Sequence, residues 1–549
     1  MTFVLNKRLL LAWFLSLPIS YVLIGFLDYF YQSLYEILFL AILLHALTSL
    51  FVYYLIGRIK NYLKLKPTES WITTFLFLAL IIFLLYLTKT ANRFSLLFDP
   101  AFYQIQSNSL IWFALGIIIA FPCSVWLLSF AHSKEFHKTR FFTFIDKNLS
   151  GILLSLAFFA IYFLLSNIFN QPLFNFDDIF FDTDAKLYRA RFGTENYEDV
   201  YWRTVHPFIL IVVRPWANII SLFLKGNLLY ASFVLIALTG ALAVFLVWYF
   251  VKETTGNSLY ALLIASLFGA STSQLVFGSI IESYGFLGTV ALIFIVLLLK
   301  NAPPWTLVIT GLAAFGITIS NIAQTVIAHF MVKRDFWQLV KYGLIVGSLI
   351  IPLNLLNNFI YPDAHPYLWD VSTLQYEEKN VFSPTPQRAY YLARVMVLNS
   401  VVAPYPILYK EDIPFIKIWM FLATTKGVLR VAEYKDVLSS FVVYAWAGLM
   451  LLGGTLFLKN IKKQDNRFLF AFILITLFSF ALHLRYGRDV FLYSSNWMYA
   501  LILFLALAWK ELANKLWFQI TLLAFVVMLL INNSKLIEIM MTVSVLHIK

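Results

Sequence analysis

The sequence predicts an all-α polytopic membrane protein with about 14 or 15 transmembrane helices and two large outer-facing loops. Of the 549 residues, 61% are hydrophobic and only 13% are charged, whereas soluble domains are about half apolar and about a quarter charged. Apolar runs of 16 to 24 residues recur along most of the chain, and each is long enough to cross about 30 Å of hydrocarbon as a helix. The runs lack the period of two that marks a membrane barrel.

The first predicted span lies close to the N-terminus. Lys7 and Arg8 precede it and no small-residue cleavage site follows, so we expect a span and not a cleaved signal peptide. The number of spans is 14 or 15, depending on whether Asn321 and Gln324 break one helix or separate two. In chain order we expect spans at 9–27, 34–57, 71–88, 109–131, 150–169, 227–251, 258–278, 283–300, 305–320, 322–332, 343–361, 438–458, 468–484, 490–509 and 516–532.

Basic residues set the expected orientation. The net charge is +13, and cytoplasmic loops of membrane proteins are rich in Lys and Arg, so no nucleic-acid partner is expected. The orientation holds only if His206–Lys225 does not cross, and we expect an amphipathic helix at the outer interface because Arg214, Pro215 and Asn218 interrupt its apolar residues. The basic loops then fall in the cytoplasm at 58–68, 132–148, 333–341 and 459–467.

The expected topology divides the chain into four regions. Two long polar segments, 170–205 and 362–437, fall on the outer face, where chemistry has both water and structural support. The regions are a four-span extension (1–149), a membrane core with a first outer loop at 170–226 (150–361), a large outer loop (362–437) and C-terminal spans (438–549).

An acidic cluster follows the fifth predicted span. Asp177, Asp178, Asp182 and Asp184 lie within eight residues, and Asp182-x-Asp184 can present two carboxylates to a divalent cation, or one as a base and one as a ligand. Asp184, Tyr188 and Arg191 would share one face of a helix. The alternative is a solvated acidic loop in which Asp184 caps a short helix.

A second acid lies at the mouth of a later span. Glu282 is the only acidic residue between Glu253 and Asp335, and the topology places it on the same face as Asp184. A carboxylate at this depth is costly unless it is hydrated, paired or bound to metal, which indicates a functional site. The alternative is a capping Glu in a short turn.

These motifs resemble the GT-C superfamily of membrane glycosyltransferases, which includes protein O-mannosyltransferases, aminoarabinose transferases and oligosaccharyltransferases. The resemblance covers about 170–324: Asp184 matches the first-loop catalytic aspartate, Tyr188 a recurrent aromatic, His206-Pro207 the start of the juxtamembrane stretch, Glu282 the second-loop acid, and Gly311–Asn321 the small-residue span that follows. The chain departs from the family in two respects, since four spans precede the first acidic loop and its second acid is Glu where Asp is common.

The resemblance implies transfer of a sugar from a polyprenyl-phosphate-linked donor to an acceptor glycan, lipid or protein at the outer face, with inversion. Asp184 is expected to be the base that takes the acceptor proton. Asp182 and Glu282 are expected to orient the acceptor or to hold a divalent cation such as Mg²⁺ or Mn²⁺. Tyr188, Arg191 and His206 are the expected substrate-binding residues of this region.

Cations for the leaving phosphate are expected in the loop between two late spans. His483, Arg485 and Arg488 lie there on the predicted outer face, against the positive-inside trend, and Arg forms paired hydrogen bonds with phosphate oxygens. The alternatives are a lipid-headgroup anchor or an Arg488/Asp489 surface pair. Weaker candidates in the large loop are Arg388, Arg394, Lys410, Lys417, Lys426 and Arg430.

Two other function classes compete with a glycosyltransferase. A secondary transporter or lipid-linked-sugar flippase would place charges near mid-span and would have paired broken helices, whereas here the acids gather at outer mouths. A non-catalytic membrane scaffold would leave Asp184 and Glu282 replaceable. We therefore expect an enzyme of the cell envelope, in a bacterial inner membrane, with its site facing the periplasm or exterior and membrane lipids around its spans.

Overall fold

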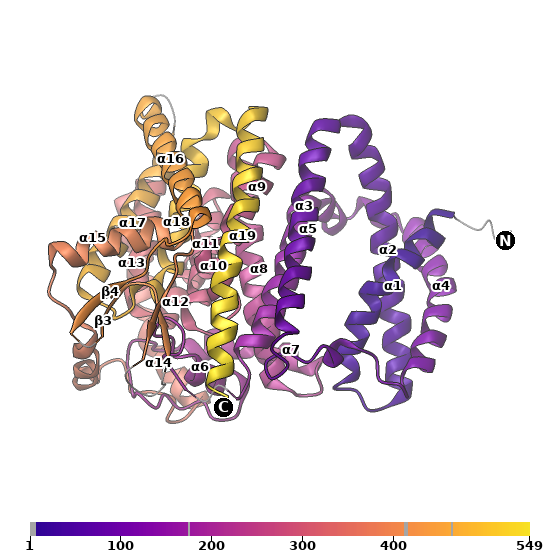
Figure 1. Ribbon diagram of the computed structural model, residues 1–549, viewed down its shortest axis with the longest axis horizontal. Helices are drawn as coiled ribbons and strands as arrows, with labels where there is room; N and C mark the ends of the chain where they lie inside the picture. Colours follow the sequence, from indigo (N-terminus) through magenta and orange to yellow (C-terminus); the bar gives the residue numbers. More distant parts are fainter. Residues whose placement is uncertain (1–6, 174–175, 411–415, 426, 463–464, 549) are drawn as a thin grey trace. The chain divides into compact units, whose positions relative to one another are not determined.

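The computed structural model describes residues 7–173, 176–410, 416–425, 427–462 and 465–548. α-Helices dominate these ranges (Figure 1), as expected for an all-α polytopic membrane protein. Ten of the described helices are long and apolar enough to cross a membrane: α1 (Lys7–Asp28), α2 (Leu34–Leu65), α3 (Pro67–Ala91), α4 (Leu110–Ser133), α5 (Arg140–Phe169), α8 (Leu228–Thr255), α14 (Phe336–Ile360), α16 (Val437–Asn460), α17 (Arg467–Arg485) and α19 (Leu516–Leu546).

Five further apolar helices are shorter, so the predicted 14 or 15 crossings stay a prediction. They are α7 (Ile209–Leu222), α9 (Ser258–Gly269), α11 (Ser283–Leu299), α12 (Pro304–Ile317) and α18 (Ser495–Ala508). The remaining α-helices of the described chain are α6 (Ala185–Gly193), α10 (Thr272–Phe277), α13 (Ile322–Lys333) and α15 (Pro386–Arg394).

The chain forms two compact units. Unit 1 comprises Met1–Phe75, Phe98–Leu149 and Ser221–Asn227, and unit 2 comprises Leu76–Leu97, Ser150–Ile220 and Leu228–Lys549. The second part of α3 therefore belongs to unit 2, and α5 passes from one unit to the other between Leu149 and Ser150.

Unit 1 packs α1, α2 and α4 around a small apolar core that includes Ile24, Ala41 and Phe113. The buried Asp28 carboxylate, at the end of α1, accepts hydrogen bonds from the Gln106 backbone (2.8 Å) and the Ser109 hydroxyl (2.7 Å). These bonds satisfy an acid that would otherwise be costly to bury.

The core of unit 2 is built from α8, α9, α11 and α18. Leu259–Gly269 of α9 is buried without exception, and so is nearly all of α18, because a helix that is apolar on every face belongs inside a bundle. Small residues let these helices approach closely. A Cβ atom at Gly288 would lie 2.9 Å from the Ser495 carbonyl oxygen, and one at Gly240 would lie 2.9 Å from the Gly278 Cα.

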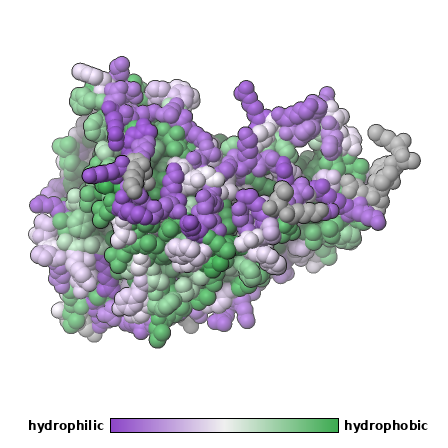
Figure 2. Space-filling model, turned by 90° about the horizontal axis from the view of Figure 1, so that it is seen from above, coloured by the Kyte–Doolittle hydropathy of each residue, from purple (hydrophilic) through white to green (hydrophobic). Residues whose placement is uncertain are grey.

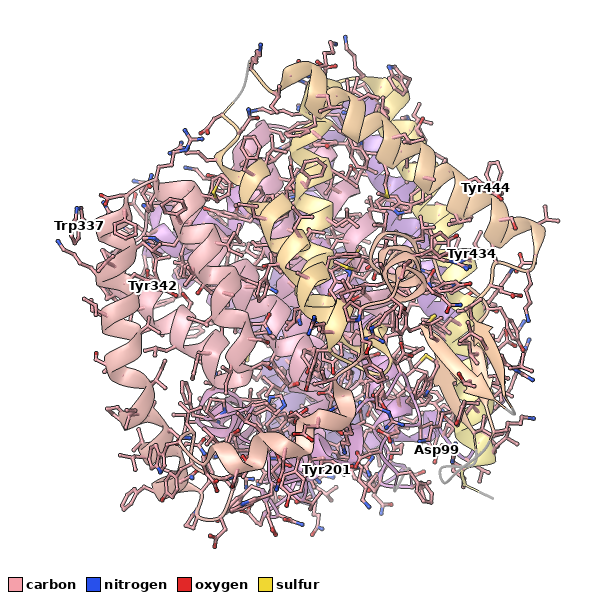
Figure 3. The ribbon with its side chains drawn as sticks, turned by 90° about the vertical axis from the view of Figure 1, so that its left-hand side faces the viewer. Asp99, Tyr201, Trp337, Tyr342, Tyr434 and Tyr444 are labelled. Atoms are coloured by element: carbon pink, nitrogen blue, oxygen red, sulfur yellow. The ribbon has the colours of Figure 1, made fainter. Side chains whose placement is uncertain are left out.

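Both long polar segments lie at one end of unit 2, which we call the loop end. The Asn170 amide donates to the Ser279 carbonyl (2.7 Å), and the Phe181 amide donates to the Ile418 carbonyl (2.7 Å). Tyr201 of the first polar segment and Trp337 of α14 accordingly lie at opposite ends (Figure 3).

The other end of unit 2, which we call the opposite end, holds two of the predicted cytoplasmic loops. Arg467 donates to the Val332 carbonyl (3.4 Å) and so joins the 333–341 and 459–467 loops. Lys459 pairs with Glu511 there (3.2 Å). Figure 2 looks onto this end, where hydrophilic side chains gather over the helix ends and hydrophobic side chains lie along the flanks.

The stretch His206–Lys225 does not cross the bundle, as predicted. The His206 ring donates to the Ile317 carbonyl at the loop end (2.5 Å). A Cβ atom at Gly193, the last residue of α6, would lie 3.2 Å from the Leu229 Cα, so α8 also begins at the loop end. The parts of unit 2 that precede and follow α7 therefore both lie at the loop end.

The predicted interruption near Asn321 separates two helices, α12 and α13. Thr318 is extended, and residues 319–321 form a single 3₁₀ turn before α13 begins. Gln324 fills the break, because its amide nitrogen donates to the Asn321 side chain (2.8 Å) and its carbonyl accepts from the buried Tyr499 hydroxyl (2.7 Å).

The second polar segment contains short helices and, unlike the rest of the fold, two small hairpins. A 3₁₀ helix η4 (Val371–Asn380) precedes α15 and a π-helical turn η5 (Val395–Asn399). Strand β1 (Ile407–Tyr409) pairs antiparallel with β2 (Lys417–Trp419), and β3 (Leu422–Thr425) pairs with β4 (Val428–Val431). These strands are a departure from the all-α expectation, and β2 contacts the candidate site.

Candidate active site

The acidic loop that precedes α6 has an unusual backbone. Asp178, Phe181 and Asp182 all have positive φ angles (66°, 56° and 64°), a conformation that costs free energy in residues other than Gly. Strand β2 holds it, since the Phe181 amide donates to the Ile418 carbonyl (2.7 Å) and the Ile418 amide donates to the Ile179 carbonyl (2.8 Å). The loop therefore keeps its acids in place through contact with a distant segment.

Asp184 and Glu282, which the sequence placed on one face, are in direct contact. Glu282 lies between α10 and α11, its side chain is 1% exposed, and its Oε2 accepts a hydrogen bond from the Asp184 backbone amide (2.9 Å). Its Oε1 accepts from the Ser283 amide (2.7 Å) and the Ser283 hydroxyl (2.9 Å). Glu282 thus caps α11, as its alternative interpretation supposed, and also fixes the start of α6.

Arg203 is the cation that faces Asp184, and the sequence analysis missed it. Its Nη1 lies 2.9 Å from Asp184 Oδ2, with only 13% of the Arg203 side chain and 19% of the Asp184 side chain exposed. Its Nε lies 3.7 Å from the fully buried Asp199, which also pairs with Arg191 Nη1 (3.3 Å). Nε and Nη2 of Arg203 are buried and have no hydrogen-bond partner, so donors remain for a ligand.

Burial shifts the acids of this cluster toward neutral pH. It raises the pKa of Asp184, because the opposing effect of Arg203 is smaller and Asp177 and Asp178 add like charge. Burial also raises the pKa of Glu282, and the Asp184 carboxylate raises it further. At Asp199, burial is outweighed by Arg203 and Arg191, which hold its pKa below the usual range. Asp184 can therefore exchange a proton, whereas Asp199 stays ionised.

Asp182 lies beside a second cation. Arg488 Nη1 is 3.5 Å from Asp182 Oδ1, and the Arg488 guanidinium lies 5.7 Å from the Trp419 ring centroid. Burial raises the pKa of Asp182, and Asp178 raises it further. Lys417 is 3.6 Å from Asp178, so Lys417, a weaker candidate in the sequence, also reaches the acidic loop.

Tyr188 and His206 pack against each other close to Asp184. The fully buried Tyr188 ring packs edge-on against His206 (centroids 5.8 Å apart), and its hydroxyl is buried without a hydrogen-bond partner. Burial lowers the pKa of His206 to about 3, so its imidazole is neutral and orients Tyr188 by packing. Arg191 is fully buried, with Nε and Nη2 unpartnered in the described chain.

The three expected phosphate-binding residues of the loop between the late spans differ in position. Arg488 reaches the acids, whereas the Arg485 side chain is exposed and its backbone carbonyl accepts from the Phe382 amide (2.7 Å). His483 is buried against Tyr493 (centroids 4.3 Å apart). The alternative of an Arg488/Asp489 surface pair is wrong, because Asp489 is fully buried and accepts from the Met420 amide (2.7 Å) and the Phe491 amide (3.1 Å).

The other cations of the large loop have structural neighbours. Arg388 donates to the carbonyls of His483, Leu484 and Gly487, and Arg394 lies against the Tyr434 ring (5.5 Å). Lys410 and Arg430 line a separate groove between the two hairpins. Lys426 lies outside the described residues.

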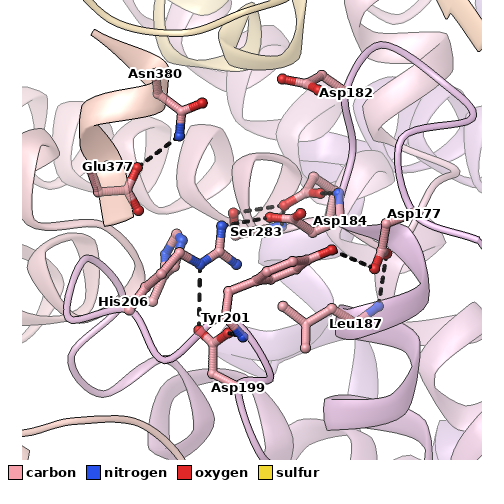
Figure 4. A network of polar contacts seen from close by, with 12 residues as sticks. Asp177, Asp182, Asp184, Leu187, Asp199, Tyr201, His206, Ser283, Glu377 and Asn380 are labelled. Atoms are coloured by element: carbon pink, nitrogen blue, oxygen red, sulfur yellow. Dashed lines mark hydrogen bonds and ion pairs between the residues drawn. The ribbon is translucent and has the colours of Figure 1, made fainter. Parts of the chain in front are cut away.

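Glu377 is a second residue that the sequence analysis missed. It lies in η4, is 8% exposed, and its Oε2 accepts hydrogen bonds from the Asn380 amide (2.9 Å) and the Tyr486 hydroxyl (2.5 Å). Its Oε1 is buried without a partner. Figure 4 shows Glu377 facing the cluster from one side, with Asp182 and Asp184 on the other.

An apolar groove of about 410 Å³ runs between α7, α8 and α11. Its lining includes Trp216, Leu238, Phe286 and Ile317, and Trp216 and Leu238 are exposed. Phe286 is one turn after Glu282, and the Ile317 carbonyl accepts from His206. Two of its lining residues are therefore close in the chain or by hydrogen bond to residues of the site, although no acid of the cluster lines the groove itself.

No group of three or more His, Cys, Asp or Glu side chains among the described residues is arranged to hold a metal ion. Both oxygens of Glu282 accept from N–H or O–H donors, and Asp182 faces Arg488. The metal-binding role expected for Asp182 and Glu282 stays a prediction, and we derive no step through a metal.

Comparison of the chain with known protein families, with curated proteins and with solved structures finds no match.

Proposed function

We propose that the protein is a membrane glycosyltransferase that moves a sugar from a polyprenyl-phosphate donor to an acceptor hydroxyl at the loop end. The observation that carries the proposal is the Asp184–Arg203 pair, buried beside Glu282. A site that takes a lipid-linked sugar needs a base, a cation for phosphate and an apolar path for the lipid. The pair supplies the first two, and the apolar groove whose lining includes Phe286, one turn after Glu282, is the proposed path for the lipid.

Asp184 is the proposed base. Its carboxylate takes the proton of the acceptor hydroxyl while the acceptor oxygen attacks the anomeric carbon, and the bond from that carbon to the phosphate oxygen breaks with its electron pair going to the phosphate. Burial supports this role, because a raised pKa makes Asp184 a stronger base than a surface aspartate while leaving it ionised in part near neutral pH.

Arg203 is the proposed partner of the leaving phosphate. Its Nη1 faces Asp184 and its Nε faces Asp199, while the buried Nη2 has no partner and offers its donors to phosphate oxygens. Charge that develops on the phosphate in the transition state is stabilised by a cation that is already in position. Arg488, which is 40% exposed beside Asp182, is a second candidate for this contact.

The apolar groove supports a lipid-linked donor over a soluble nucleotide sugar. A prenyl chain can leave the bilayer along Trp216 and Leu238 and reach Phe286 without crossing polar surface. Burial of each CH₂ group contributes about 0.8 kcal/mol, so a few isoprene units account for most of the donor affinity.

The test is Asp184→Asn in the purified full-length protein in lipid nanodiscs. Polyprenyl-phosphate-linked hexoses and pentoses are supplied one at a time with a membrane-lipid extract as acceptor, and released polyprenyl phosphate is measured by mass spectrometry. We expect the wild type to release polyprenyl phosphate and D184N to release it at least ~100-fold more slowly.

Asp363→Asn is the matched control, since Asp363 is an exposed aspartate at the same end. Full activity of D184N would remove Asp184 as base, and no release by wild type from any donor contradicts the proposed function.

A further inference from the structure

Glu377 comes to the site from the large loop, far along the chain from the acids of the first. Asn380 and Tyr486 together occupy Oε2, so this oxygen is fully used within the protein. Oε1 is buried with no donor in reach among the described residues. A buried acceptor without a hydrogen bond costs free energy, so a residue held in this way is better explained by a ligand than by folding.

Two other groups with unpartnered atoms, the Arg203 guanidinium and the Tyr188 hydroxyl, belong to the acidic cluster that Glu377 faces. The Arg203 guanidinium is surrounded by Asp184, Asp199, Tyr188 and Glu377, all of which act on its charge. Nevertheless Glu377 and Arg203 form no ion pair within 4 Å in the described structure, unlike Arg203 and Asp184. Arg203 Nη2 and the Tyr188 hydroxyl are likewise buried without partners.

The unused atoms define the chemistry of what lies between them. Glu377 Oε1 needs a donor, Arg203 Nη2 needs an acceptor, and the Tyr188 hydroxyl takes either. A sugar that carries several hydroxyl groups and is attached to a phosphate offers partners to each of them, since each hydroxyl both donates and accepts. Neither an apolar ligand nor an ionised phosphate ester without a sugar supplies the donor that Glu377 requires.

We infer that Glu377 is a substrate-binding residue whose Oε1 accepts a hydrogen bond from a hydroxyl of the transferred sugar, with Tyr486 and Asn380 as its positioning residues. The inference rests on the proposed function. The hydroxyl belongs to the donor sugar and not to the acceptor, because Glu377 faces Arg203 and Arg203 is the proposed contact of the phosphate bonded to that sugar. The large loop thereby selects the sugar, while the first loop performs the chemistry.

The experiment compares Glu377→Ala and Glu377→Gln with Glu378→Gln, all in the full-length protein in nanodiscs. Glu378 is the adjacent, exposed acid and is the matched control. With the active polyprenyl-phosphate sugar as donor, we expect E377A to raise the donor KM roughly 10- to 100-fold with little change in kcat, because a hydrogen bond to a charged group is lost. E377Q, which keeps an acceptor oxygen, should fall between E377A and wild type, and E378Q should match wild type.

Donors that lack one hydroxyl separate binding from a structural role. One deoxy donor should show the same rise in KM with the wild type that E377A shows with the full sugar, and E377A should not distinguish the two donors. Tyr486→Phe should give a smaller rise, because Oε2 loses one of its two donors.

Three results would overturn the inference while leaving the proposed function intact: an unchanged donor KM in E377A, equal discrimination against every deoxy donor in E377A and wild type, or a loss confined to kcat and thermal stability. Absence of transfer by the wild type from every lipid-linked sugar would instead remove the proposed function, and the inference with it.

Discussion

The two ends of unit 2 use charge in contrasting ways. At the opposite end, Lys459–Glu511 and Lys300–Glu253 are ion pairs whose side chains are 31% to 61% exposed. At the loop end, Asp184–Arg203 and Arg191–Asp199 are 0% to 19% exposed. Exposed pairs contribute little to stability and are replaceable, whereas burying a charged pair carries a desolvation cost that folding alone does not require. The contrast separates exposed ion pairs at one end from buried ion pairs at the end where the proposed site lies.

The largest expected effect is that of removing Arg203. Arg203→Ala leaves Asp184 and Asp199 without their shared cation, and breaking a buried pair in this way costs about 3–5 kcal/mol. The free energy of unfolding in mixed micelles measures the loss, and transfer activity should be lost as well. Arg203→Lys should recover much of the stability but little of the activity, because one ammonium cannot bind Asp184 and a phosphate in a forked geometry. If R203A unfolds like wild type, the pair is not buried as described.

The next effect is a change in pH dependence. The proposed base must be ionised, so the rate should fall as the pH is lowered through the pKa of Asp184, which burial raises. Asp178 adds negative charge that raises this pKa further. Asp178→Asn should therefore move the acid limb of the kcat/KM profile to lower pH, as measured across pH values from about 5 to about 8. D363N should leave the limb in place, and a shift of D178N to higher pH contradicts the electrostatic account.

The smallest effect should appear at the opposite end. Lys459→Ala removes one partner of an exposed pair, and we expect a change in the free energy of unfolding below about 1 kcal/mol with unchanged activity. A loss of unfolding free energy as large as that of R203A would contradict the proposed difference between exposed ion pairs at the opposite end and buried ion pairs at the loop end.

Much of the fold could be predicted because apolar runs and basic loops follow from the bilayer itself. The ten long apolar helices, the break before α13 and the placement of Asp184 and Glu282 at one end are examples. The last span is predicted at 516–532 from its apolar run. Instead α19 continues to Leu546, because Asn533 donates to the Ala270 and Val401 carbonyls and Asn532 donates to the Ala403 carbonyl. Those carbonyls come from segments that the sequence cannot place.

Arg203 and Glu377 could not be predicted for a similar reason, because their partners come from segments that the sequence cannot place beside them. Arg203 and Glu377 lie in polar segments without periodicity, and nothing next to them in the chain distinguishes them from other charged loop residues. The nearest usable signal is Tyr201-Trp202-Arg203, a cation among aromatics immediately before the interfacial stretch. Glu377 becomes recognisable only once Tyr486, more than a hundred residues later, donates to it.

The order of synthesis adds a consequence of the contact between β2 and the acidic loop. Phe181 leaves the ribosome more than two hundred residues before Ile418, the residue that holds its backbone. At roughly 5–20 residues per second, the acidic loop waits at least ~10 s for the strand that fixes it. A nascent chain that stops before β2 can insert its first spans yet cannot hold Asp182 and Asp184 in place. Activity is therefore expected only from chains completed well into their C-terminal third.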